Sequence, residues 1–120
     1  MTSIRLEEKT IDLNGRTYVL HVNMSVLDRI QGACGGNING LLQKNMYDGN
    51  AITMAAMLND WSEDQGWEEE WTAKKVKKLF SASMMNMLDV TGMFFRALTP
   101  ENETEAPKSE DGNQDIESGN

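Results

Sequence analysis

The dipeptide Asn14-Gly15 is the feature that most constrains the fold of this chain, because it stands between two short runs of alternating apolar residues. Both residue types tolerate the positive φ that each central position of a type I′ turn requires. A two-residue turn there pairs Leu13 with Arg16 and fixes the register of the flanking strands. The segment IDLNGRTYVLHV is therefore predicted to form a β-hairpin.

The predicted hairpin has one apolar face. In the register above, that face carries Ile11, Leu13, Tyr18, Leu20 and Val22. A two-stranded ribbon is marginally stable alone, so this face is expected to pack on helices or on another chain. Tyr18, Leu20 and Val22 are accordingly the candidate residues for self-association. Ile4 and Leu6 have the opposite parity, so the first strand either contains a bulge or begins late, near Lys9.

Helical patterns follow the hairpin. Ser25 is expected to cap a first helix that the glycines of GACGG end, and INGLLQKNMY is expected to form a short second helix. The tripeptide DGN is expected to end this second helix. Asn50 then caps a third helix that runs to about Trp61. Thr72 caps the longest pattern, which is one helix or two helices with a bend near Ser81–Ser83.

Apolar residues recur every three or four positions in this last pattern: Val76, Phe80, Met84, Met87, Leu88, Thr91, Phe94, Phe95 and Leu98. Met85 falls outside that stripe and is expected to be exposed in a monomer. The predicted fold class is α+β and mainly α, with the N-terminal hairpin packed on a small bundle of four to five helices.

Charge divides the chain at about Thr99. Residues 100–120 hold seven acidic side chains and one lysine, a net charge of −6, and are predicted to form a disordered acidic tail. Residues 1–99 hold 12 acidic and 10 basic side chains and are predicted to form the folded domain. Such a nearly neutral body argues against nucleic acid as the main partner, since binding the phosphate backbone needs clustered Lys and Arg. The acidic tail is either a solubilising extension or an interaction point.

Catalytic and metal-binding patterns are not found. His21 is the only histidine, and its alternation with Leu20 and Val22 predicts a solvated strand residue. Cys34 is the only cysteine, which rules out an internal disulfide and a cysteine-based zinc site. The glycine-rich GACGGNING follows a helix and lacks the Lys-[Ser/Thr] of a phosphate-binding loop. We therefore expect no enzyme, no metal and no cofactor. No apolar run is long enough to span a bilayer and the N-terminus has no signal-peptide core, so a soluble intracellular protein is expected.

Three features suit the binding of other proteins: nine methionines, three tryptophans among acids, and four lysines at positions 74, 75, 77 and 78. Methionine adapts to irregular partners, and an exposed tryptophan marks an interface. The alternatives are that the methionines fill the core, the tryptophans anchor their loop, and the lysines form a solvated face. The candidate partner-binding residues are Trp61, Trp67, Trp71, Met54, Met57, Met84, Met85, Met87, Phe94 and Phe95.

The order of these elements resembles that of the tail assembly chaperones of long-tailed bacteriophages. That family opens with an x-h-x-G-x-x-Y-x-L-x-h pattern (h, hydrophobic), which Leu13, Gly15, Tyr18 and Leu20 match here. Its T-x-x-x-V-x-x-L helix is matched by Thr72, Val76 and Leu79. The resemblance covers roughly residues 8–98. Lys74 and Lys75 stand where family members often have acids.

The resemblance implies a protein that binds and solubilises the tape measure protein and helps recruit tail tube subunits. Its partners would be the tape measure protein, the tail tube protein or a frameshifted form of the chain, and other copies of itself. It would act in the host cell cytoplasm and be absent from the mature virion. A structural tail or connector subunit retained in the virion is the alternative. An acidic DNA mimic is disfavoured, because most of the excess charge lies in the tail.

Overall fold

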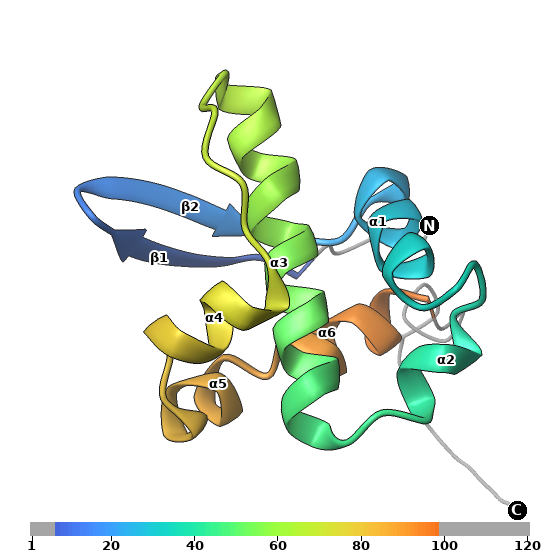
Figure 1. Ribbon diagram of the computed structural model, residues 1–120. Helices are drawn as coiled ribbons and strands as arrows, with labels where there is room; N and C mark the ends of the chain where they lie inside the picture. Colours follow the sequence, from blue (N-terminus) through green and yellow to red (C-terminus); the bar gives the residue numbers. More distant parts are fainter. Residues whose placement is uncertain (1–6, 99–120) are drawn as a thin grey trace, which may run out of the picture.

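The computed structural model describes residues 7–98, which form an antiparallel hairpin followed by six helical segments (Figure 1). The hairpin strands are β1 (Lys9–Leu13) and β2 (Arg16–Leu20). The helices are α1 (Met24–Ala33), α2 (Asn39–Leu42), α3 (Met46–Gln65), α4 (Ala73–Leu79), α5 (Ala82–Leu88) and α6 (Val90–Ala97). The prediction of a mainly helical α+β fold with an N-terminal hairpin is confirmed. The predicted acidic tail, residues 100–120, and the boundary at about Thr99 lie outside the described residues.

The hairpin has the predicted register. Leu13 pairs with Arg16 and Ile11 with Tyr18, and the strand begins at Lys9. Asn14 and Gly15 have φ values of 50° and 79°, as a type I′ turn requires. Tyr18 and Leu20 are fully buried. Of the two expected surroundings for this face, the structure has the helices: β2 packs against α3.

Substitution of Gly15 by Ala is expected to lower the free energy of unfolding by about 1 kcal/mol, because a Cβ is strained at positive φ. An added Cβ would meet no atom within 4 Å, so crowding contributes nothing to this cost. Urea denaturation measures the change. Asn14→Gly, at the neighbouring position of the same turn, is the control and should leave the midpoint nearly unchanged. Equal stabilities of the Gly15→Ala variant and the wild type would contradict the type I′ geometry.

The first helix begins earlier than predicted. Asn23, not Ser25, is the N-cap of α1, and its Oδ1 accepts a hydrogen bond from the backbone N–H of Val26 at 2.8 Å. Asn23 has the extended backbone that an N-cap needs, and Asn is at least as good a cap as Ser. The helix ends at Ala33, within the GACGG segment that was predicted to end it.

Helix α3 is longer than predicted and lies at the centre of the fold. The DGN tripeptide does not interrupt the helix. Asn45 is the N-cap, and its side chain accepts a hydrogen bond from the N–H of Asp48 at 2.8 Å. Gly49 lies inside α3, where a Cβ would meet Leu41 of α2 only at an ordinary contact distance of 3.8 Å. The predicted helix start at Asn50 is therefore wrong. The helix runs to Gln65 and contacts β2, α1, α4 and α6 (Figure 1).

Three short helices replace the long C-terminal pattern. Thr72 caps α4 as predicted, but Phe80 takes an extended conformation and Ser81 caps α5. Asp89, with φ 49°, then separates α5 from α6. The predicted bend near Ser81–Ser83 corresponds to the first break only.

These breaks shift the phase of the apolar stripe, so the prediction for Met85 is wrong. Met85 is buried, whereas Met84 and Met87, which the periodicity placed on the buried stripe, are 45% and 80% exposed. Side chains three or four positions apart share one face of a helix only while its repeat of 3.6 residues per turn is unbroken. The extended residue Phe80 rotates α5 relative to α4.

The core lies between α3 and the elements around it. Its largest fully buried side chains are Tyr18, Phe94, Leu20, Ile30, Met54, Met57, Leu58 and Met93.

No helix in the described range 7–98 is both long and apolar enough to cross a membrane.

Candidate protein-binding surface

A groove opens between the first turns of α3 and the helices α4 and α5. It has a volume of about 220 Å³. Eight residues line it: Tyr47, Asn50, Ala51, Val76, Lys77, Phe80, Ala82 and Met85. The break at Phe80 separates α4 from α5, and both helices contribute residues to the groove.

Exposed apolar side chains lie on the same three helices as the residues that line the groove. Met46, Leu79 and Met84 are 61%, 49% and 45% exposed, and each is next in sequence to a lining residue. Tyr47, itself a lining residue, is 58% exposed, and Met87 of α5 is the most exposed of all at 80%. Several large exposed apolar side chains on neighbouring helices are a feature of binding surfaces. We call these five residues, with the groove, the α3–α5 surface.

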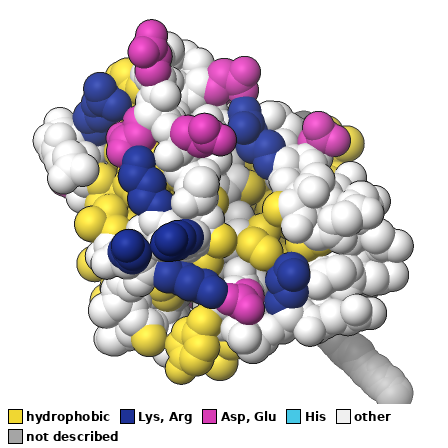
Figure 2. Space-filling model, in the orientation of Figure 1, with side chains coloured by type: hydrophobic (Ala, Val, Ile, Leu, Met, Phe, Trp, Pro, Cys, Tyr) yellow, Lys and Arg dark blue, Asp and Glu magenta, His cyan; other side chains and the backbone are white. Residues whose placement is uncertain are grey.

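Lysines border this surface on α4. Lys77 lines the groove and forms an ion pair with Asp48 of α3. The hydrogen bond from Lys77 is the main cause that lowers the pKa of Asp48 below its ordinary value. Lys74 and Lys78 form no ion pair with any residue of the described range. Figure 2 shows Lys and Arg side chains gathered over α4, next to hydrophobic side chains.

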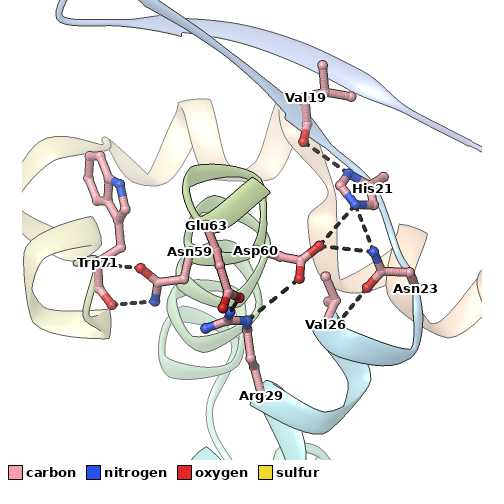
Figure 3. A network of polar contacts seen from close by, with 9 residues as sticks. All are labelled: Val19, His21, Asn23, Val26, Arg29, Asn59, Asp60, Glu63 and Trp71. Carbon is pink, nitrogen blue, oxygen red and sulfur yellow. Dashed lines mark hydrogen bonds and ion pairs between the residues drawn. The ribbon is translucent and has the colours of Figure 1, made fainter. Parts of the chain in front are cut away.

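A network of polar side chains, separate from the α3–α5 surface, joins the hairpin to α1 and α3 (Figure 3). Asp60 of α3 is buried, and its Oδ2 lies 3.2 Å from His21 Nε2 and 2.9 Å from Asn23 Nδ2. His21 Nδ1 lies 3.2 Å from the carbonyl oxygen of Val19. Burial, the largest influence, raises the pKa of Asp60, but hydrogen bonds from Ser25 and Asn23 and the charge of His21 together lower it below its ordinary value.

The prediction that His21 is a solvated strand residue is wrong. Its side chain is only 18% exposed. Strand β2 ends at Leu20, so the alternation along the strand does not extend to His21. No sequence pattern pointed to Asp60 as its partner, because the two residues are 39 positions apart.

The contacts of Asp60 join the end of the hairpin and the start of α1 to α3. Ser25 and His21 both hydrogen-bond to the carboxylate of Asp60. In a hydrolytic triad, by contrast, the histidine stands between the hydroxyl and the acid. Within residues 7–98, no group of three His, Cys, Asp or Glu side chains could hold a metal ion.

The tryptophans proposed for partner binding pack on the hairpin. Trp71 is buried, and Trp61 and Trp67 are half-buried against the core. Trp67 and Trp71 meet the ring of Tyr18 edge-on at centroid distances of 5.1 and 6.0 Å. Arg16 covers Trp67 at 4.5 Å from its ring centroid. Asn59 of α3 forms two hydrogen bonds to the backbone of Trp71, which hold the loop between α3 and α4 in place.

The other candidates divide between core and surface. The side chains of Met54, Met57, Met85 and Phe94 are buried, and Phe95 is half-buried and meets Phe94 edge-on. Met84 and Met87 alone among these candidates are well exposed, and they lie on the α3–α5 surface. Of the self-association candidates, Tyr18 and Leu20 are buried and Val22 is half-buried.

The sequence did not single out Met46, Tyr47 or Leu79 for binding. Their exposure results from the cap at Asn45 and the break at Phe80, neither of which the apolar periodicity indicates. Comparison of the chain with protein-family models, with curated proteins and with solved structures finds no match.

Proposed function

We propose that this protein is a tail assembly chaperone that binds an apolar helical segment of a tape measure protein on the α3–α5 surface. The observation that supports it most is the apolar groove, whose helices also carry the exposed side chains of Met46, Met84 and Met87. Methionine side chains are flexible and polarisable, so one surface of this kind fits many similar helices along a long client.

The size of the groove favours an anchoring side chain over a small-molecule ligand. Its volume of about 220 Å³ is below the roughly 300–1,000 Å³ of typical ligand pockets. One or two large aliphatic or aromatic side chains of a helix, spaced at three or four residues, would fill it. The exposed methionines would then cover the remaining apolar face of the client helix.

In this proposal the protein keeps the client soluble in the host cell cytoplasm until tail tube subunits assemble around it. The chaperone then leaves, so it is absent from the mature virion. Adaptable contacts of this kind suit transient binding, because affinity comes from a few anchors and not from a large fixed interface.

Replacing both Met84 and Met87 by Ser is expected to weaken client binding by about 2 kcal/mol, or roughly thirtyfold, because two exposed apolar contacts are lost. The fold should be retained, since both side chains are well exposed. The measurement is co-expression with a tape measure protein, scored by the amount of client that is soluble and co-purifies. Met24→Ser is the matched control: Met24 is 76% exposed but lies on α1, away from the groove.

Two results would overturn the proposal. The first is a double variant that solubilises the client as well as the wild type does. The second is a client that stays insoluble with the wild-type chain while the chain is found in purified particles, which would favour the structural subunit retained in the virion.

A further inference from the structure

The two edges of the hairpin differ in whether the backbone groups that point outward have hydrogen-bonding partners. In an antiparallel pair, alternate residues of each strand turn their N–H and C=O groups away from the partner strand. Because the two-residue turn closes on the pair Leu13–Arg16, those outward groups are set by the register. They belong to Thr10 and Asp12 of β1 and to Thr17 and Val19 of β2.

Side chains close the edge of β2. Trp61 of α3 donates from Nε1 to the carbonyl oxygen of Thr17 at 3.1 Å. The carbonyl oxygen of Val19 lies 3.2 Å from His21 Nδ1. Both outward carbonyl groups of β2 therefore have a hydrogen-bonding partner, and α3 lies beside that strand.

The edge of β1 is open. Within residues 7–98, no backbone hydrogen bond beyond the hairpin itself involves Thr10 or Asp12, and both residues are exposed. An open strand edge is a template for pairing with another strand. Such pairing would satisfy the outward N–H and C=O groups of both residues at once.

We propose that β1 pairs with β1 of a second copy, antiparallel about a two-fold axis at Ile11, to give a four-stranded sheet. This register places Thr10 opposite Asp12 of the second copy, and Ile11 opposite Ile11. The whole of Lys9–Leu13 is then paired. A hydroxyl beside a carboxylate is a favourable cross-strand pair, and Thr17 already donates to Asp12 at 2.8 Å within one copy.

The neighbouring two-fold registers are worse. A shift of the axis to Asp12 would place Asp12 directly opposite Asp12, and a shift to Thr10 would place Asp12 opposite Glu8. Like charges directly opposite one another destabilise a strand pair. In the proposed register, the two Asp12 side chains are diagonal neighbours about 7–8 Å apart on the solvent face, where water and salt screen them.

The pairing also covers apolar surface. Ile11 and Leu13 are only half-buried in one copy. Five residues from each copy are far fewer than the roughly 20–30 a side of a stable interface, so the dimer is weak and its population depends on concentration. Copies held side by side on one client would pair more readily, because their effective concentration is high. The inference stands independently of the proposed client.

The test removes the outward N–H of β1. Thr10→Pro should weaken self-association at least tenfold while leaving the β1–β2 ladder intact, because Thr10 directs its N–H away from β2. Thr10→Val keeps that N–H and should still associate. Sedimentation equilibrium up to millimolar concentration measures both, and circular dichroism checks the fold. A wild-type chain that stays monomeric throughout this range would overturn the inference, as would a folded Thr10→Pro variant that associates like the wild type.

Cross-linking tests the register without the proline. Directly opposite residues that are not hydrogen-bonded to each other have Cα atoms about 4.5 Å apart, which a disulfide can span. In a Cys34→Ser background, Ile11→Cys should therefore form a disulfide-linked dimer, whereas Thr10→Cys, displaced from the axis, should not. Equal cross-linking of the two variants would overturn the two-fold at Ile11. Neither measurement involves a client, so failure here leaves the proposed function to be judged by its own experiment.

Discussion

Substitution of Asp60 by Ala is expected to lower the free energy of unfolding by about 2–4 kcal/mol, measured by urea denaturation. The side chain of Asp60 is only 5% exposed, and its carboxylate is the common partner of His21, Asn23 and Ser25. Without it, several half-buried donors lose their acceptor at once. The cost of unsatisfied donors is larger than the modest net gain of each hydrogen bond.

Glu63→Gln is the matched control for this prediction. Glu63 lies on the same helix and forms an ion pair with Arg29, but its side chain is 70% exposed. An exposed pair contributes about 0–1 kcal/mol, so this variant should remain close to the wild type. If the two substitutions had similar effects, Asp60 would not hold the hairpin, α1 and α3 together as Figure 3 indicates.

The same carboxylate gives stability a pH dependence. The pKa of Asp60 is lower in the folded chain than its ordinary value. Its stabilising contribution is therefore complete above the unfolded pKa of about 4 and is lost as the pH falls through the lower folded pKa. The Asp60→Asn variant should lose less stability than the wild type between pH 4 and pH 2, when each is compared with its own stability at pH 7.

Local rules predicted the hairpin and the cap at Thr72. The Asn14-Gly15 turn determines the register of its own strands, and the Thr72 side chain reaches only to the next helical turn, at Lys75. Nothing distant can easily override interactions of such short range. The start of α3 was harder to predict, because Asn45 and Asn50 are both good caps and DGN is a common breaker. In the structure the side chain of Asn45 accepts from the N–H of Asp48, so α3 has the earlier start.

The α3–α5 surface could not be predicted in this way. Its exposed residues depend on the break at Phe80, where the apolar periodicity continues without a slip. The His21–Asp60 contact was missed for a different reason, since it joins a strand end to a helix far along the sequence. Periodicity reports which residues share a face of an unbroken helix, and it contains no information on where the helix ends.

Substitution of Met85 by Ala is expected to lower the free energy of unfolding by about 2–4 kcal/mol, because a buried methionine is replaced by a cavity. Met87→Ala, on the same helix, should cost less than about 0.5 kcal/mol, since Met87 is 80% exposed. Chemical denaturation of the two variants provides the comparison, and the substitution is the same at both positions.

Comparing Met85→Ala with Met87→Ala distinguishes two arrangements of the C-terminal helices. A continuous helix with the sequence periodicity would bury Met87 and expose Met85, so the order of the two effects would be reversed. The extended backbone at Phe80 makes Met85 a core residue and leaves Met87 exposed. A larger destabilisation by Met87→Ala than by Met85→Ala would therefore contradict both the break and the α3–α5 surface that depends on it.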